Sequence, residues 1–408
     1  MSLARGRCPG ISNPMPTGDG LLTRLSCDAP IPIPEFVALC EASSILGNGS
    51  VEVTQRGNLQ FRGLTETSAP DFAKEVTSLG LGTRAATVSS SPLLGLDSLE
   101  ELDVRELVER ARGIRASGPK VSVLIDGGGK LHLDQLPADI RLRAASHGLL
   151  HLSWGETPLG WIHPGNAVAV IERLLTALGQ NSRARDVHPP PQIDGLIAGS
   201  APATRPRAEP VGTHELKHAG IALGVALPFG HSTAGALQRL ARAAAVRGAE
   251  SIRPSPGRAL LVIGLSPMAA QHLATVAAEQ NFIVEPNDPR RHVVACTGSP
   301  GCASATLPTR ELAPAIALAA GELLDGSITI HLSGCAKGCA HPRRASLTIA
   351  GPDRVTLDGT AADREHGTCS PTQLVAGIER LRRHKDGRAS ADLLHRLGPA
   401  RVLELLRG

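Results

Sequence analysis

Short apolar runs alternate along this chain with longer stretches in which apolar residues recur at a helical period. Apolar runs of roughly four to eight residues are typical of buried strands, and a period of about 3.6 residues is typical of amphipathic helices. We expect strands at Val121–Ile125, Gly148–Ser153, His292–Ala295, Ile328–Leu332 and Ser346–Ile349. We expect helices at Ser98–Arg115, Asn166–Leu178, Thr309–Leu324, Pro371–His384 and Ala391–Arg407. This alternation predicts a mixed α/β fold.

Two segments repeat the same order of predicted elements. Residues 18–64 and 224–265 each read as strand, loop, helix, glycine turn and strand, and each ends near a Gly-Leu pair. The second copy has Ser232 as the expected helix N-cap, and one face of its helix carries Leu237, Leu240, Ala241 and Ala244. The repeat predicts that two copies pair into one pseudo-symmetric sheet. Residues 186–212 between them are rich in Pro, Ala and Gly and are predicted to form a linker.

Composition narrows the class of protein. The 408 residues are 42% hydrophobic with a mean hydropathy near zero, which indicates a globular protein of more than one domain. No apolar run is long enough to span a membrane, and the start MSLARGRCPGISNP lacks a signal-peptide core, so we expect a cytoplasmic protein. A net charge of +4 and only 2% aromatic residues argue against nucleic-acid binding. The composition does not exclude a local basic pocket that binds a polyanionic small molecule.

Four cysteines in the C-terminal third have the spacing of a metal site. Cys296 and Cys302 form a C-x5-C pair, and Cys335 and Cys339 form a C-x3-C pair. Structural zinc usually takes tighter C-x2-C pairs, whereas these wider, glycine-rich loops suit an iron–sulfur cluster. Zinc and unrelated core thiols are the alternatives. We expect free thiols at the other cysteines, which are Cys8, Cys27, Cys40 and Cys369.

The segment VEVTQRGNLQFRGL, residues 51–64, has the period-2 pattern of a strand around Gly57. Its apolar positions are Val51, Val53, Leu59 and Phe61, and its polar positions are Thr54, Arg56, Gln60 and Arg62. Guanidinium groups bind carboxylates through two parallel hydrogen bonds, so these arginines are candidate anion-binding residues. A solvated strand face is the alternative. Arg24 lies at the end of the first predicted strand and, by the repeat, near the same place.

The cysteine spacing and the stretch T-x-R-x-x-x-Q-F-x-G resemble the nitrite and sulfite reductase family. The resemblance implies that family's fold: a pseudo-two-fold repeat of ferredoxin-like half-domains plus two larger α/β domains. The expected divisions are a first half-domain at 1–80, a first α/β domain at 81–185, the linker at 186–212, a second half-domain at 213–285 and a second, cluster-carrying α/β domain at 286–408.

The same resemblance implies a set of site residues. A 4Fe-4S cluster is expected on Cys296, Cys302, Cys335 and Cys339, with Cys339 in the position that also contacts the sirohaem iron of the reductases. Substrate contacts are expected from Arg24, Arg56, Gln60, Arg62 and Lys120, with catalytic roles for Arg56 and Lys120. The reductases present two lysines to their anion; Lys120 matches the first, and Ser122 replaces the second.

Within this family, the start RGRCPGISNPMPTGDGLLTRL, the DGGG turn and the string SGCAKGCAHP resemble the precorrin-3B synthase branch. That resemblance implies an O2-dependent monooxygenase of aerobic cobalamin biosynthesis. It would hydroxylate precorrin-3A, a sirohaem-like tetrapyrrole, at C20 and close a γ-lactone. The resemblance is also compatible with a mononuclear non-haem iron, whose ligands the sequence does not identify. No dinucleotide fingerprint follows a predicted strand, so we expect an external donor or reductase that draws on a carrier such as NADH.

Two other functions stay open at this point. A sirohaem-dependent sulfite or nitrite reductase would bind sirohaem and would be expected to have a lysine at position 122. A non-catalytic electron carrier or iron–sulfur sensor would need no basic cavity that binds a macrocycle.

Overall fold

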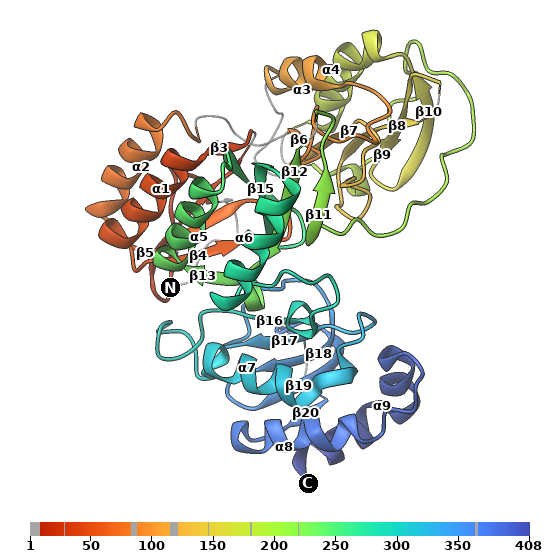
Figure 1. Ribbon diagram of the computed structural model, residues 1–408. Helices are drawn as coiled ribbons and strands as arrows, with labels where there is room; N and C mark the ends of the chain where they lie inside the picture. The colour runs from red at the N-terminus through yellow and green to blue at the C-terminus, as the bar shows by residue number, and fades with distance from the viewer. Residues whose placement is uncertain are drawn as a thin grey trace.

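A computed structural model of the chain describes residues 9–27, 29–82, 88–114, 121–145, 147–179, 182–218, 220–363 and 366–408 (Figure 1). Within these ranges the strands form four five-stranded sheets with helices packed on them, which confirms the mixed α/β class. Two of these sheets form the lobe that contains the N-terminus, and each of the other two has a lobe of its own (Figure 1). None of the described helices is long and apolar enough to cross a membrane.

The two repeated segments form two sheets that exchange one short strand each. The first sheet has the order β1 (Met15–Thr17), β2 (Gly20–Leu25), β5 (Leu59–Leu64), β4 (Ser50–Val53) and β13 (His231–Thr233). The second has the order β11 (Gly212–Glu215), β12 (Ile221–Ala226), β15 (Ala259–Leu265), β14 (Ser251–Ser255) and β3 (Ile31–Pro32). Because β13 comes from the second segment and β3 from the first, the halves are interlocked. The repeat is present, but the expectation of one common sheet is wrong.

Helices cover these two sheets and share one hydrophobic core with them. They are α1 (Ile33–Leu46), α2 (Ser68–Ser78), α5 (Ala234–Val246) and α6 (Pro267–Glu279), and the short helix η3 (Pro228–Gly230) precedes β13. The predicted apolar face of α5 is buried. The N-cap of α5 is Thr233, whose side chain accepts a hydrogen bond from the Ala236 amide at 3.2 Å, and not Ser232 as expected.

The other two sheets share one pattern of strand directions, with two parallel pairings followed by two antiparallel ones. One contains β6 (Val88–Ser90), β7 (Val123–Asp126), β8 (Ile140–Ala145), β9 (Leu149–Trp154) and β10 (Thr157–Ile162), with α3 (Arg105–Arg112), η1 (Pro164–Asn166), α4 (Ala167–Leu178) and η2 (Ala184–Asp186). The other contains β16 (Val293–Ala295), β17 (Ile330–Ser333), β18 (Ala345–Ala350), β19 (Arg354–Gly359) and β20 (Gly367–Thr368), with η4 (Pro289–His292), α7 (Thr309–Ala320), η5 (Gly321–Leu323), α8 (Pro371–Arg382) and α9 (Ser390–Arg407).

Two predicted elements differ from the structure. The helix expected from Ser98 begins only at Arg105, because residues 92–99 form turns in which the Asp97 carboxylate accepts the Leu99 amide at 2.9 Å. The expected strand over residues 51–64 is a hairpin of β4 and β5. Thr54 and Asn58 close its turn through two hydrogen bonds, and Gly57 takes the positive φ of 76° that the turn requires.

Candidate functional site

The four cysteines lie where two parallel strands end. Cys296 directly follows β16, Cys335 follows β17, and Cys302 lies in the loop before α7. The Gly334 amide donates to Cys296 Sγ at 3.1 Å, as backbone amides do around iron–sulfur sites. A Cβ on Gly18 would collide with Cys302 Sγ, so glycine in the β1–β2 turn leaves room beside this thiol. The site is therefore built from both the C-terminal sheet and the N-terminal hairpin.

The described cysteine thiols do not have the spacing that a single zinc ion requires. Tetrahedral zinc with Zn–S bonds of about 2.3 Å places its sulfurs about 3.8 Å apart. Among the described residues, no group of three or more His, Cys, Asp or Glu ligand atoms within 4.8 Å of one another includes a cysteine. Desolvation, followed by repulsion from Cys296 and Cys335, raises the pKa of Cys339 to about 11. The positive charge of bound iron ions would stabilise the thiolate forms of these cysteines.

The other cysteines lie away from these loops. Cys40 and Cys369 are buried free thiols, and Cys27 is half-buried. Cys8 lies outside the described residues.

A cavity of about 440 Å³ extends from Cys339 between the interlocked sheets and the C-terminal sheet. The charged side chains on its wall are strongly unbalanced. One carboxylate, that of Glu52, faces six arginines, which are Arg24, Arg56, Arg207, Arg258, Arg291 and Arg343. Its remaining wall includes the backbone and side chains that flank Cys339, among them His341 and Pro342. A cavity with this lining suits a small molecule that carries several negative groups.

Arg24 and Gln60 face each other across the β2–β5 pairing on this wall. With its amide oxygen toward Arg24, Gln60 accepts hydrogen bonds from Arg24 Nε at 3.1 Å and Nη2 at 2.7 Å, and it donates to Glu52 at 3.1 Å. Two of the expected substrate-binding residues are therefore brought together. Their mutual hydrogen bonds fix the orientation of the Arg24 guanidinium group at the cavity wall.

Arg56 lies at the tip of the β4–β5 hairpin and also lines the cavity. Its Nη2 donates to the Pro137 carbonyl at 2.6 Å, which ties the hairpin to the N-terminal α/β lobe. Burial, followed by the charges of Arg183 and Arg343, lowers the pKa of Arg56 below its usual value. A negative group in the cavity would relieve that repulsion.

Arg62 is placed differently from the expectation that it meets the substrate. It does not line the cavity; its side chain is 6% exposed and forms a bidentate ion pair with Asp19. Glu52 lies 3.5 Å from Arg62 Nη1 on its other side. The carboxylate partners of Arg62 thus belong to the protein, and the Arg62–Asp19 pair connects β5 to the β1–β2 turn beside Cys302.

The lysine position differs from the reductase pattern. Lys120 lies outside the described residues. The Ser122 side chain does not face the cavity, because its amide and hydroxyl donate to Asp139 at 2.9 and 3.1 Å. Asp139 is in turn paired with Arg183. A serine at this position therefore belongs to a buried ion-pair network.

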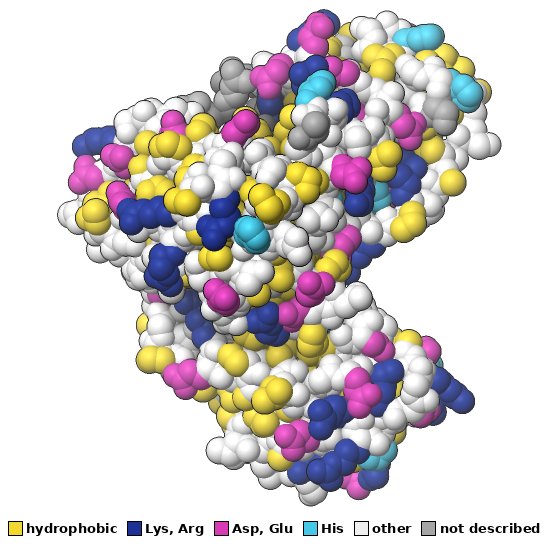
Figure 2. All heavy atoms as spheres, viewed as in Figure 1, with side chains coloured by type: hydrophobic (Ala, Val, Ile, Leu, Met, Phe, Trp, Pro, Cys, Tyr) yellow, Lys and Arg dark blue, Asp and Glu magenta, His cyan; other side chains and the backbone are white. Residues whose placement is uncertain are grey.

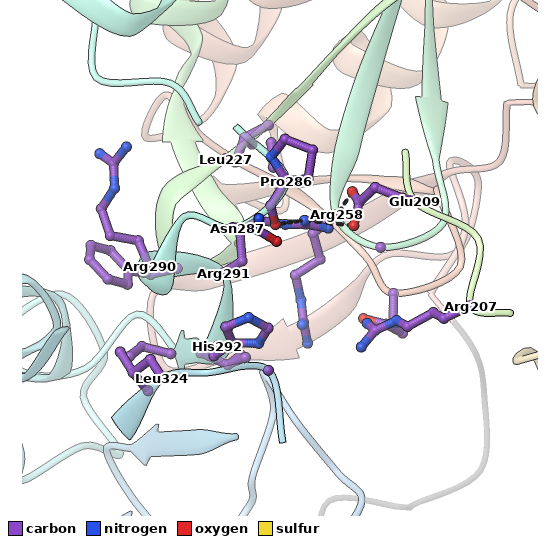
Figure 3. Close-up of a pocket in the computed structure, with 18 of the residues that line it drawn as sticks. Arg207, Glu209, Leu227, Arg258, Pro286, Asn287, Arg290, Arg291, His292 and Leu324 are labelled. Carbon is purple, nitrogen blue, oxygen red and sulfur yellow. Dashed lines mark hydrogen bonds and ion pairs between the residues drawn. The ribbon is translucent and has the colours of Figure 1, made fainter. Parts of the chain in front are cut away.

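Four of the cavity's arginines were not predicted from the sequence. Arg207 comes from the inter-half connection, Arg258 from the turn before β15, Arg291 from η4, and Arg343 from the loop after Cys339. An adjoining cavity of about 340 Å³ shares Arg207, Arg258, Arg291 and His292, and Arg207 and Arg258 reach into the open space beside His292 (Figure 3). Of these arginines, only Arg343 lies near a motif that was recognised in the sequence, because it follows Cys339 by four residues.

The one group of His, Cys, Asp and Glu with metal-ligand spacing among the described residues does not fit a mononuclear iron. It consists of Asp126, His132 and Asp134. The Arg205 guanidinium lies among them, with Nη2 at 2.5 Å from Asp126 and 2.7 Å from Asp134. A fixed cation already neutralises these carboxylates, so we assign no iron to them.

The chain is similar over its length to proteins of known name. No family model matches it. A precorrin-3B synthase from Sinorhizobium sp is 36% identical and covers 98% of this chain and 94% of its own length. A ferredoxin–nitrite reductase from Synechococcus elongatus is 25% identical over 76% of this chain and 71% of its own. The solved structure of Mycobacterium tuberculosis NirA protein has a TM-score of 0.70 at 20% identity and covers 94% of this chain and 84% of that one, which confirms the fold.

Proposed function

The chain belongs to the precorrin-3B synthase family, which is related to the nitrite and sulfite reductases, and from this premise we propose that it is an oxidoreductase that hydroxylates precorrin-3A. The observation that carries the proposal is the cavity beside Cys339, where six arginines face one glutamate. Precorrin-3A is an octacarboxylate, and each guanidinium group can meet one of its carboxylates through two hydrogen bonds.

The cofactor we propose is a 4Fe-4S cluster on Cys296, Cys302, Cys335 and Cys339. Bound there, such a cluster supplies single electrons. Cys339 belongs both to this set and to the cavity wall, so the substrate would lie directly against the cluster loops. An external donor or reductase, ultimately using a carrier such as NADH, is proposed to deliver the electrons.

The proposed reaction balances with dioxygen and two electrons. One oxygen atom forms the new C20 hydroxyl, and the other leaves as water with two protons and the two donor electrons. Closure of the γ-lactone then joins an acetate carboxyl group of the substrate to the ring carbon beside C20; the double bond between these two carbons is broken, and the carboxyl proton goes to the oxygen on C20. The chain's own residues would bind and orient the macrocycle: Arg24, held by Gln60, and Arg56, held by Pro137, fix two of its carboxylates.

Lys120 stays a proposed substrate-binding and catalytic residue on the resemblance alone. The competing function, sirohaem-dependent reduction of sulfite or nitrite, needs cations that protonate a small anion. Ser122 and its partner Asp139 supply no such cation. This difference favours the synthase over the reductase.

The test uses anaerobically purified protein. We would record its absorption spectrum, extract it for tetrapyrroles, and then add precorrin-3A, a reductant and air. An iron–sulfur spectrum without sirohaem, together with a product one oxygen atom heavier, is the expected result. Bound sirohaem with turnover of sulfite or nitrite would overturn the proposal in favour of the reductase.

A further inference from the structure

The connection between the two halves is anchored on both sides of Arg207. On one side, Arg205 pairs with Asp126 at 2.5 Å and Asp134 at 2.7 Å on the N-terminal α/β lobe. On the other, Glu209 pairs at 2.8 Å with Arg291, a residue of η4 in the C-terminal lobe. The two anchoring residues, Arg205 and Glu209, each lie two positions from Arg207, so the backbone at Arg207 is held on both sides.

Hydrogen bonds extend this attachment along the connection. His132 Nε2 lies 2.7 Å from the Pro206 carbonyl oxygen, and Arg143 Nη2 donates to the Ala203 carbonyl at 2.8 Å. The segment expected to be a linker therefore lies as a strap on the protein surface. Asp126, His132 and Asp134, the group with metal-ligand spacing, hold this strap through Arg205 and Pro206.

The Arg207 side chain itself is available to bind a ligand. Across the described part of the chain it has no hydrogen-bond or ion-pair partner, and its exposed side chain lines both adjoining cavities. Arg343, on the loop after Cys339, is likewise exposed and without a partner among the described residues. Arg258 donates to the Ala340 carbonyl at 2.9 Å and has no carboxylate within ion-pair distance in that same region.

The charges of Arg207 and Arg343 both act on Arg258. Desolvation lowers the pKa of Arg258 to about 10; the Glu52 charge opposes that shift, and the charges of Arg343 and Arg207 add to it. Figure 3 shows Arg207 and Arg258 directed into the same open space. Like charges that outnumber the single carboxylate of their cavity are stabilised by an anionic ligand.

We propose that Arg207, Arg258 and Arg343 form a carboxylate subsite in which Arg207, positioned by the anchored strap, selects tetrapyrroles by their peripheral carboxylates. This inference rests on the proposed function and names how the same cavity would discriminate among substrates. Arg24 and Arg56 hold the side of the ring near the β4–β5 hairpin, and the subsite holds the side near the strap. A tetrapyrrole with fewer carboxylates would leave some of these cations unpaired.

The test compares porphyrin binding by the cluster-loaded full chain, followed by absorbance titration. The probes are uroporphyrin III, an octacarboxylate, and coproporphyrin III, a tetracarboxylate. The variants are Arg207→Gln, Arg207→Lys and, as a matched control, Arg185→Gln, whose 81% exposed side chain lies away from the cavities. Thermal unfolding checks that all variants fold as the wild type does.

We expect the wild type to prefer uroporphyrin III. Arg207→Gln should weaken uroporphyrin binding about tenfold and reduce that preference, because a charge-assisted contact is lost. Arg207→Lys should recover part of the loss, and Arg185→Gln should behave as the wild type. Unchanged binding by Arg207→Gln would overturn the subsite while leaving the proposed function intact. If the protein prefers uroporphyrin III in an Arg207-dependent way but does not convert precorrin-3A, the proposed function would be overturned and the subsite would stand.

Discussion

Arg62 donates two hydrogen bonds to Asp19, from Nε to Oδ2 at 2.8 Å and from Nη2 to Oδ1 at 2.9 Å. Both side chains are nearly inaccessible, at 6% and 2% exposure. Thr297, the residue after Cys296, donates to the same carboxylate at 3.5 Å. Burial raises the pKa of Asp19, but the hydrogen bonds and charge of Arg62 outweigh it and hold the pKa below its usual value. This pair therefore joins the N-terminal sheet, as an ionised unit, to the loop that follows Cys296.

Asp19→Asn should destabilise the protein by about 3 kcal/mol, because it leaves the Arg62 charge buried without its main partner. Urea unfolding of the cluster-loaded chain measures the change. Asp71→Asn is the control, since Asp71 and its partner Lys74 are 59% and 79% exposed and such a surface pair contributes little. Equal stabilities of the two variants would show that Glu52, 3.5 Å from Arg62, fully compensates for the lost charge.

Gly18→Ala should reduce cluster content by roughly half or more, because packed interiors leave no room for an added methyl group. A Cβ at this position would meet Cys302 Sγ and would lie 3.0 Å from the backbone nitrogen of Ala303. The Ala303 amide also donates to the Gly18 carbonyl at 2.8 Å, so the two loops cannot separate without losing that bond. Iron and acid-labile sulfide per chain give the measurement.

The matched control for this variant is Gly10→Ala in the same N-terminal segment. A Cβ there has no heavy atom within 4 Å. Normal iron content in Gly18→Ala would mean that the β1–β2 turn moves away when the cluster is loaded, contrary to our interpretation.

Cys302→Ser should remove most of the iron–sulfur absorbance, because a serine hydroxyl is a far weaker ligand than a thiolate. Cys369→Ser in the same lobe is the control. The Cys369 thiol donates to the Leu406 carbonyl at 3.3 Å, a contact that a hydroxyl retains. A full iron–sulfur spectrum in Cys302→Ser would exclude this residue from the ligand set.

The sequence predicted the parts of the site that local patterns determine. Cys296 and Cys335 follow predicted apolar strands, and neighbouring parallel strands bring their carboxyl ends together. Arg24 and Gln60 belong to strands of the repeated segment, and their pairing follows from that repeat. The register of the turn between β4 and β5 was missed, because the period-2 pattern continues through Gly57.

Tertiary packing determines the rest of the site, and no local pattern reports it. Arg62 finds Asp19 only once β1, β2 and β5 pair, so a carboxylate partner within the protein was not foreseen. The exchanged strands β3 and β13 contain two and three residues, too few to show a period. Arg207 lies in a Pro- and Ala-rich segment that reads as a linker, and its position depends on ion pairs with two different lobes.

His331 on β17 offers a prediction about pH. The side chain is fully buried, neither ring nitrogen has a hydrogen-bond partner among the described residues, and its ring centroid lies 5.6 Å from that of His341. Burial, followed by the charges of His341 and Arg258, lowers the pKa of His331 to about 3. The folded protein thus holds this imidazole neutral at a pH where the unfolded chain binds a proton.

Because the folded-state pKa lies below the ordinary value of 6.5, His331 weakens stability only as the pH falls below 6.5. Its contribution should be near zero at pH 8 and should reduce the free energy of unfolding by about 2 kcal/mol at pH 5. His331→Leu should remove that part of the pH dependence, and it should not destabilise the fold strongly, since it deletes two unpaired buried nitrogens. Unfolding free energies of both proteins from pH 8 to pH 5 test this. Parallel pH profiles would mean that His331 is protonated in the folded protein, and histidine ring resonances would then show its titration above pH 5.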